Sequence, residues 1–403
     1  MTQHALRRRR GWWLALALTA LMAEKATAQE DFADCIDAIR MAAVREGVSP
    51  GTAETLLTGV TPSERVIELD RRQPEFTSTL AGYLQRRVSD ARIEQGRAML
   101  VEHAGLLRRI TREYGVPGRY IVAFWGLETN YGQFVGDMST IRSLATLACD
   151  RRRGAFFRGE LIAALQLADR GTVPPERLRG SWAGALGNFQ FLPSVYRDHA
   201  VDADGDGRPD LWNSFEDAAV SAAAFLQARG WQAGERWGRE VQLPADFDLA
   251  LLAHRQSLAD WSRAGVRRAD GTALPDADLD GRLLLPAGVR GPAFLVYDNF
   301  DVIMRWNPSR FYALSVGLLA DRLIGAPPLA VSPPADEPLA IAAVRVMQER
   351  LNRLGHEAGK PDGRIGPQTR AALQSFQRRV DLPPDGYPDP DTLARLEEVA
   401  AQN

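Results

Sequence analysis

The chain has 403 residues, and at roughly 150 residues per domain this length indicates two or three domains. Apolar residues make up 45% and charged residues 25%, a globular composition that excludes wholesale disorder and a fibrous repeat. The 49 basic and 51 acidic residues leave a formal charge of −2, so we expect no nucleic-acid partner bound through bulk positive charge.

The first 28 residues have the composition of a secretory signal peptide. Arg7 to Arg10 form a basic run, Trp12 to Ala23 are apolar, and Ala26 to Ala28 supply the small residues that a signal peptidase recognises. The apolar run is short for a membrane span, although a retained anchor is the alternative. No cysteine lies near the cleavage point, so a lipoprotein is not indicated. We therefore predict a periplasmic protein that has lost residues 1–28.

Export affects the interpretation of the two cysteines, Cys35 and Cys149, because an oxidising compartment permits a disulfide. They can pair in one way only, and two buried thiols are the alternative. The five histidines are scattered without an HExxH spacing, so we expect no catalytic zinc.

Helical apolar spacing predominates from Phe32 to about Ala326, and a few short strands are expected between Trp237 and Val296. Residues 326–338 contain five prolines, which predicts an extended, semi-rigid linker. The chain thus divides into a large domain over residues 29–325 and a small one over residues 339–403.

The small domain contains an internal repeat. Asp362-Gly363 precedes Thr369 by seven residues, and Asp385-Gly386 precedes Thr392 by the same distance. Each unit predicts a tight Asp-Gly turn, a threonine N-cap and then a helix. Chance similarity of two turn-helix units is the alternative.

Glu128 is the candidate for acid–base chemistry. It lies seven residues after Ile121, four after Phe124 and three after Trp125, so a helix would place its carboxyl on an apolar face. Desolvation there raises a carboxyl pKa, which suits a general acid. A glutamate buried for structural reasons is the alternative.

The segment from Gly180 to Ser194 combines small residues with polar side chains and aromatic rings. Ser181, Asn188 and Gln190 offer hydrogen bonds beside Trp182, Phe189 and Phe191. This mixture fits a carbohydrate cleft and tight helix packing equally well.

An acidic loop follows, with aspartates at positions 1, 3 and 5 of an EF-hand-like pattern and a glycine at the sharp turn. The usual glutamate at position 12 of the pattern is missing, and Glu216, further along the chain, would close a lengthened loop. We predict a hard cation, Ca²⁺, held by Asp202, Asp204, Asp206, the Arg208 carbonyl and Glu216. A solvated Asp/Gly turn is the alternative.

Long motifs in this chain resemble the lytic murein transglycosylase B family over residues 32–325. The motifs are RQPEF (72–76), RVSDAR (87–92), WGLETNYG (125–132), GSWAGALGNFQFLPS (180–194), DGDGRPDLWNSFEDA (204–218), GWQAGERWGREV (230–241) and the run over 291–322. The segment DGRIGPQTRAALQSFQ (362–377) resembles a peptidoglycan-binding domain.

The resemblance implies a mostly α fold: a lysozyme-like catalytic domain with a small mixed region, and a small three-helix peptidoglycan-binding domain. It implies cleavage of the β-1,4 bond between N-acetylmuramic acid and N-acetylglucosamine to give a 1,6-anhydro sugar. Glu128 would be the sole catalytic acid/base, and the acidic loop would match the family's cation site. The residues expected to line the sugar cleft are Ser181, Gln190, Asn307 and Tyr312. Trp306 stands where some members carry a tyrosine.

On this resemblance the chemistry needs no cofactor, and the predicted Ca²⁺ is structural. The expected partners are peptidoglycan glycan strands and cell-wall synthesis proteins, with the chain itself monomeric. The small domain would target the enzyme to its substrate, or it packs without a ligand. A hydrolytic muramidase and an inactive peptidoglycan-binding scaffold are the alternative functions.

Overall fold

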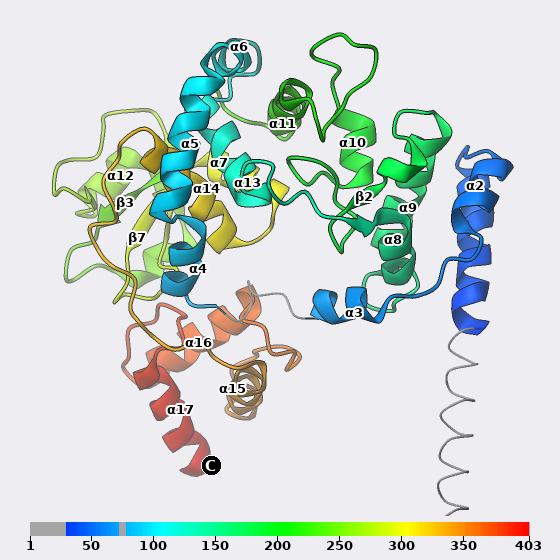
Figure 1. The fold of residues 1–403 in the computed structure, drawn as a ribbon. Helices are drawn as coiled ribbons and strands as arrows, with labels where there is room; N and C mark the ends of the chain where they lie inside the picture. The colour runs from blue at the N-terminus through cyan, green and yellow to red at the C-terminus, as the bar shows by residue number, and fades with distance from the viewer. Residues whose placement is uncertain (1–29, 72–77, 403) are drawn as a thin grey trace, which may run out of the picture. The chain divides into compact units, whose positions relative to one another are not determined.

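The computed structural model describes residues 30–71 and 78–402, and the predicted signal peptide lies outside them. Contacts divide the chain into two compact units. Of the described residues, 30–71 and 135–218 form the first unit, and 78–134 and 219–402 form the second (Figure 1).

The first unit is mainly helical. After a helix over residues 30–45, its regular elements are α2 (Pro50–Leu57), α3 (Glu64–Arg71), β1 (Met138–Ser139), α8 (Thr140–Ala148), α9 (Gly154–Asp169), the 3₁₀ turn η2 (Pro175–Arg177), β2 (Arg179–Gly180) and α10 (Pro193–His199). Helix α9 packs against α2, α8 and α10, and its residues 161–165 are almost wholly buried. Strands β1 and β2 pair antiparallel, with Met138 opposite Gly180.

A disulfide between Cys35 and Cys149 joins the helix over residues 30–45 to the residue that ends α8. The predicted pairing is present, and the alternative of two buried thiols is wrong. The bond links positions 114 residues apart in the sequence.

The second unit contains helices, a sheet and three C-terminal helices. Its first helices are α4 (Leu80–Arg87), α5 (Asp90–Glu102), α6 (Ala104–Tyr114) and α7 (Gly118–Thr129). Helix α11 (Phe215–Ala228) begins in the last residues of the first unit and continues in the second. The remaining helices are η3 (Leu249–Ala253), α12 (Leu258–Arg263), α13 (Asp298–Trp306), α14 (Arg310–Leu323), α15 (Ile341–Arg353), α16 (Pro367–Arg379) and α17 (Pro390–Gln402). Helix α7 packs against α5, α6 and α14, which bury nearly all of it.

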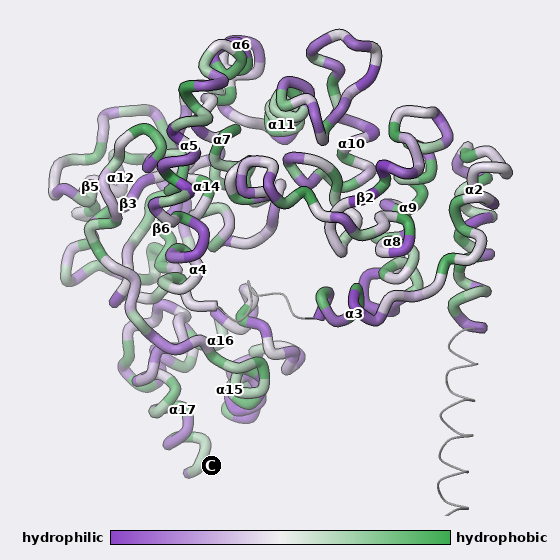
Figure 2. Tube along the Cα trace, viewed as in Figure 1, coloured by the Kyte–Doolittle hydropathy of each residue, from purple (hydrophilic) through white to green (hydrophobic). Residues whose placement is uncertain are grey.

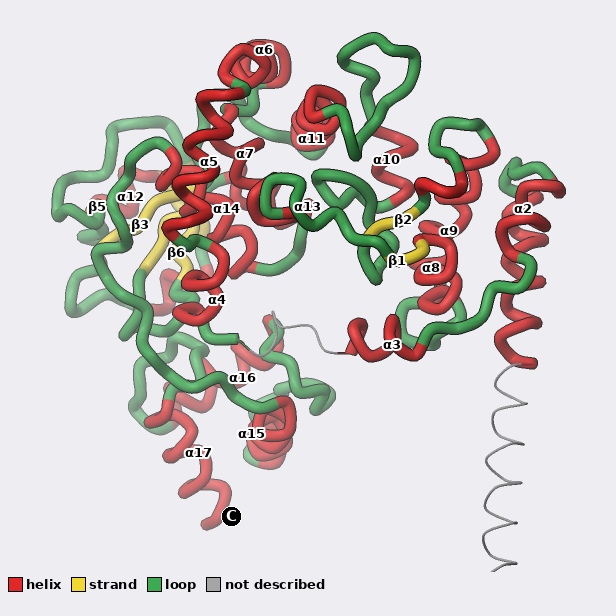
Figure 3. The backbone as a smooth tube through the Cα atoms, in the orientation of Figure 1, coloured by secondary structure: helices red, strands yellow, loops and turns green. Residues whose placement is uncertain are grey.

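The strands expected between Trp237 and Val296 form one antiparallel sheet in the order β4-β6-β7-β3-β5. Figure 3 shows β3, β5 and β6 of this sheet in yellow. They are β3 (Gly238–Gln242), β4 (Arg255–Ser257), β5 (Arg267–Arg268), β6 (Asp280–Leu284) and β7 (Ala293–Val296). Trp261, Leu295 and Tyr297 are buried in the core that this sheet covers. The mostly α fold with a small mixed region is therefore confirmed.

The C-terminal helices have one buried face each. Figure 2 shows hydrophobic and hydrophilic residues alternating along α15 and α17. Leu351, Leu373 and Phe376 are fully buried between these helices and α16. In the part of the chain that the structure describes, no helix is long and apolar enough to cross a membrane.

The sequence repeat in this domain corresponds to a repeated hydrogen-bond arrangement around a buried glutamine. The amide of Gln348 donates to Asp362 Oδ1 and Thr369 Oγ1, at 3.1 and 3.0 Å, and its Oε1 accepts the Gly363 N–H at 2.9 Å. In this repeat, one glutamine side chain therefore links the Asp-Gly turn to the threonine by hydrogen bonds.

Gln377 makes the same contacts in the second repeat. Its amide donates to Asp385 Oδ1 and Thr392 Oγ1, at 3.0 and 3.2 Å, and its Oε1 accepts the Gly386 N–H at 2.8 Å. Gly386 has a φ of +73°, and a Cβ there would lie 2.9 Å from a backbone oxygen. Glycine is therefore required at this turn.

The predicted threonine N-caps are wrong. Helices α16 and α17 begin at Pro367 and Pro390, two residues before the threonines. Proline suits the first helical position because its missing N–H would have no helical partner there. Thr369 and Thr392 lie inside the first turn instead and serve as acceptors for the glutamines.

Reducing the disulfide should lower the free energy of unfolding by about 3–5 kcal/mol, because the bond restricts a long loop in the unfolded chain. The measurement is the melting temperature with and without dithiothreitol. The double variant Cys35→Ser, Cys149→Ser should melt like the reduced protein and be insensitive to reductant. A melting temperature unchanged by reduction would contradict this.

The stability of the C-terminal domain should fall with pH below about 6.5, the usual histidine pKa. Burial, followed by the nearby Arg379 charge, lowers the pKa of His356. The folded domain therefore binds fewer protons than the unfolded chain, so acid favours unfolding. Melting temperatures between pH 8 and 5 should show this slope, His356→Phe should reduce it, and the exposed His254→Phe should leave it unchanged. An identical slope in His356→Phe would refute the prediction.

Candidate active site

Glu128 lies at the end of α7, a helix that is otherwise withdrawn from solvent. Residues 120–127 are all buried, and so is Thr129, whereas Glu128 keeps part of its surface exposed. Ile121 and Phe124, which the spacing places on the same face, are fully buried. The carboxyl therefore has an apolar setting and retains access to solvent.

Two side chains from a distant part of the sequence donate to the same oxygen of this carboxyl. Trp306 Nε1 lies 2.9 Å and the Tyr312 hydroxyl 2.5 Å from Glu128 Oε1. Burial, and after it the Glu128 charge, raises the pKa of Tyr312 well above its usual value. The phenol consequently remains protonated and acts as a donor to the carboxylate.

Trp306 is the last residue of α13, and its indole packs against two aromatic rings. Its ring centroid lies 4.5 Å from that of Phe124 and 5.3 Å from that of Phe225. Sequence reasoning noted only that Trp306 replaces a tyrosine and missed its contact with Glu128.

The turn after Glu128 is strained and tightly packed. Asn130 and Tyr131 have φ values of +51° and +60°, in the left-handed region that non-glycine residues rarely adopt. Tyr131 is buried, and its hydroxyl donates to the Arg92 carbonyl at 2.7 Å. Strain of this kind costs about 1–3 kcal/mol per residue and persists only where packing enforces it. The Tyr131 contacts therefore fix the end of α7 and with it Glu128.

The remaining cleft residues predicted in the second unit lie close to this site in the chain. Asn307 directly follows α13 and Trp306, and its Oδ1 accepts the Ser309 N–H at 3.2 Å. Ser309 in turn is the N-cap of α14, accepting from the Tyr312 N–H. The structure thus brings Glu128 and Tyr312 into contact and places Asn307 in the connection between α13 and α14.

Ser181 and Gln190 belong to the first unit, where both organise one loop. Ser181 Oγ accepts the Ala185 N–H at 3.1 Å. Gln190 has a φ of +51°, and its Nε2 donates to the Gly187 and Val135 carbonyls, both at 3.0 Å. These contacts assign each side chain a role in loop structure, and their predicted role in sugar binding stays a prediction.

The acidic loop of the first unit is preformed by its own carboxylates. Asp202 accepts the N–H groups of Gly205 and Gly207, at 2.8 and 2.9 Å, and Asp206 accepts that of Arg208 at 3.1 Å. These hydrogen bonds hold the aspartate side chains of the loop against its own backbone.

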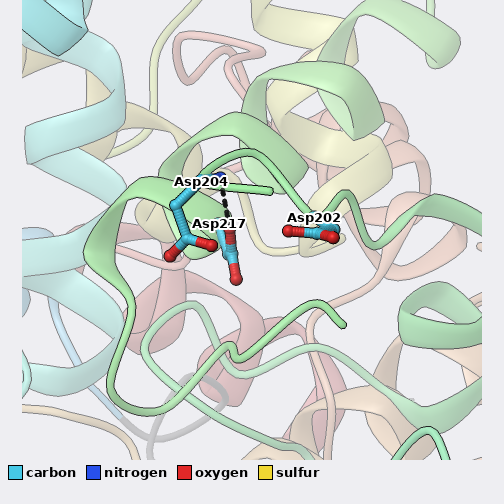
Figure 4. Close-up of side chains that lie close together, drawn as sticks. All are labelled: Asp202, Asp204 and Asp217. Atoms are coloured by element: carbon cyan, nitrogen blue, oxygen red, sulfur yellow. Dashed lines mark hydrogen bonds between the residues drawn. The ribbon is translucent and has the colours of Figure 1, made fainter. Parts of the chain in front are cut away.

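Asp217 is an acid of this loop that sequence reasoning missed. It is fully buried, and its two oxygens accept the Ala203 and Asp210 N–H groups, both at 2.8 Å. Ligand oxygens of Asp202, Asp204 and Asp217 lie within 4.8 Å of one another (Figure 4). The run Ser214 to Asp217, which resembles a capping box at the start of α11, was the available signal.

These oxygen donors fit a hard cation such as Ca²⁺. The group that the structure brings together shares Asp202 and Asp204 with the predicted ligand set and adds Asp217. The other predicted ligands, Asp206, the Arg208 carbonyl and Glu216, stay predictions.

Comparisons with known proteins define the class. The Transglycosylase SLT domain family matches residues 31–321, and a peptidoglycan binding domain family matches residues 342–396. Because the first match covers more than half of the chain, the chain belongs to the transglycosylase SLT family. Its fold and family are those of peptidoglycan lytic transglycosylases.

Individual relatives agree with this class. SltB3 from Pseudomonas aeruginosa, solved in complex with NAG-NAM-pentapeptide, is 44% identical with a TM-score of 0.86, covering 91% of this chain and 99% of that chain. SltB1 from the same organism is 32% identical with a TM-score of 0.64, over 72% of this chain and 97% of that one.

A curated relative is the membrane-bound lytic murein transglycosylase B of Escherichia coli K12, 32% identical over 240 residues. The match covers 58% of this chain and 64% of that protein, so the chain spans slightly under two thirds of that relative's length.

The packing of Tyr131 against α7 gives a prediction at Gly126. A Cβ at Gly126 would lie 2.7 Å from the Tyr131 ring. Gly126→Ala should therefore destabilise the protein by about 1–3 kcal/mol through overpacking and reduce activity by displacing Glu128. Denaturant unfolding and peptidoglycan turnover measure both effects.

Gly105→Ala is the matched control, because Gly105 lies in helix α6 and a Cβ added there would have no neighbour within 4 Å. This substitution should stabilise the protein by about 0.5–1 kcal/mol, the usual helical gain over glycine, and leave turnover unchanged. Equal unfolding free energies for the two variants would contradict the packing account.

Proposed function

We propose that this chain cleaves the β-1,4 bond between N-acetylmuramic acid and N-acetylglucosamine without water, leaving 1,6-anhydro-muramyl ends. Glu128 serves as the single acid/base. The observation that carries this proposal is the half-buried Glu128 carboxyl, which accepts from Trp306 and Tyr312 in a chain of the transglycosylase family. The SltB3 complex with NAG-NAM-pentapeptide supports the same substrate class.

One carboxyl is enough for this reaction. Protonated Glu128 donates its proton to the glycosidic oxygen as the bond to the muramyl C1 breaks, and the electron pair leaves with that oxygen. The muramyl N-acetyl group shields the developing positive charge, as in substrate-assisted glycosidases. Glu128, now ionised, takes the proton of the muramyl C6 hydroxyl, and that oxygen closes on C1. The intramolecular nucleophile has an effective molarity of about 10⁵ M or more, which disfavours water.

Glu128→Gln should lower kcat on peptidoglycan by about 100- to 10,000-fold, the usual contribution of a general acid–base. The amide keeps the shape of the side chain and can still accept at its oxygen, so substrate binding should survive. Glu94→Gln is the control, because Glu94 is exposed on α5 of the same unit. Wild-type turnover by Glu128→Gln would exclude the assignment.

We further propose that the acidic loop binds Ca²⁺ for structural reasons. The three clustered carboxylates support this, and so does the Escherichia coli relative Slt35, solved in complex with calcium, which is 28% identical over 73% of this chain. The acid–base steps written above pass through Glu128 alone and need no metal ion, so we assign the cation a structural role.

Removing Ca²⁺ with EGTA should lower the melting temperature, because a ligand present at 100 times its Kd stabilises a fold by about 2.7 kcal/mol. Turnover of soluble fragments well below the melting temperature should change little. Asp202→Asn should abolish the calcium effect, and Asp246→Asn, in the second unit, should not. A loss of turnover with no change in melting temperature would contradict a structural role.

The match of residues 342–396 to a peptidoglycan binding domain supports a targeting role for the C-terminal helices. A tethered binding module raises the local concentration of substrate at the catalytic unit. A cell-wall substrate also supports the periplasmic location that the N-terminal composition predicts.

A further inference from the structure

The two donors at Glu128 Oε1 differ in chemistry. A tyrosine hydroxyl donates one hydrogen bond and accepts others, so Tyr312 can adapt to either form of the carboxyl. An indole N–H only donates, does not titrate in this range and offers no lone pair in return. The Trp306 N–H therefore forms a favourable hydrogen bond with Oε1 only while that oxygen can act as an acceptor.

The indole has little freedom to move away from this oxygen. It contacts the rings of Phe124 and Phe225, and both of these rings are buried. The helix that carries Trp306 is anchored by Asn299, whose amide is fully buried and donates to the Gln232 and Glu235 carbonyls, both at 2.9 Å. The donor is thus placed before substrate arrives.

We propose that Trp306 is a positioning residue that keeps Glu128 Oε1 unprotonated, so that the other oxygen, Oε2, carries the proton in the reaction. An Oε1 that bore the proton would be a much weaker acceptor for the indole N–H, and the indole could not accept from it. This inference rests on the proposed role of Glu128 and adds the atom through which it acts.

The consequence concerns both steps of the reaction. Oε2 gives its proton to the leaving oxygen, and the same Oε2 then takes the proton of the C6 hydroxyl, so the carboxyl ends as it began. No rotation of the carboxyl is needed between the steps, because Oε1 is held throughout. Without the indole, Tyr312 alone contacts Oε1, and because its hydroxyl can also accept, the proton can lie on Oε1. Oε2 is then not always the protonated oxygen, and water gains time to attack C1 before the C6 hydroxyl is deprotonated.

Trp306→Phe removes the N–H while keeping an aromatic ring in contact with Phe124 and Phe225. Loss of one hydrogen bond to a charged group should lower kcat by about 10- to 100-fold. KM should stay within about twofold, and the share of hydrolysed over anhydro products should rise. Trp306→Tyr, which restores a donor, should recover part of kcat and of the anhydro product.

Trp237→Phe is the matched control. Trp237 belongs to the second unit, is buried, and like Trp306 donates its indole N–H to a carboxylate, at 3.0 Å to Asp321 Oδ2. This variant should keep the wild-type kcat and product ratio, even if its melting temperature falls. Melting temperatures of all variants separate a folding effect from an effect on the reaction.

The outcomes separate this inference from the proposed function. An inactive Glu128→Gln together with wild-type kcat and products for Trp306→Phe would overturn the inference alone. Equal losses in Trp306→Phe and Trp306→Tyr, with an unchanged product ratio, would make Trp306 a packing residue and also overturn it. An active Glu128→Gln would remove the proposed function itself.

Discussion

The hydrogen bonds at Glu128 Oε1 are the constraint on which the catalytic part of this protein depends. They join α7 to α13 and α14, over sequence separations of 178 and 184 residues. Helices α7 and α14 pack directly against each other, and the first turn of α14 holds Tyr312. The site therefore forms only when α7 has packed together with α13 and α14.

The surroundings of this carboxyl hold it by packing as well as by polar contacts. Helix α7 is buried along nearly its whole length, and Glu128 is the residue near its end that keeps part of its surface exposed. The strained turn that follows fixes the end of the helix. Tyr131 closes that turn against Gly126 and Arg92. Strain that packing maintains at the end of a catalytic helix is a form of preorganisation, because the acid is oriented before substrate binds.

Sequence spacing predicted features that depend on neighbouring residues. The apolar face beneath Glu128, the acidic turn and the repeated Asp-Gly turns all follow from periods of a few residues. The contact of Trp306 with Oε1 lay beyond this reasoning, because no local pattern relates Trp306 to a residue 178 positions earlier.

The wrong prediction of threonine N-caps and the oversight of Asp217 have the same origin. The threonines of the repeat were predicted as N-caps on local propensity, whereas the buried glutamines Gln348 and Gln377 use them as acceptors. Asp217 was overlooked, because a pattern of ligand positions does not reveal which acid the backbone N–H groups already surround. Burial and partner choice decide these roles, and both are properties of the folded chain.

The central claim is that a C6 hydroxyl, and not water, completes the reaction begun by Glu128. Digestion of purified peptidoglycan in H₂¹⁸O, followed by mass spectrometry of the products, tests it most directly. The account predicts muropeptides lighter by one water than the hydrolytic products, with no ¹⁸O at the muramyl C1. Reducing-end products that carry ¹⁸O would contradict it and establish a hydrolase.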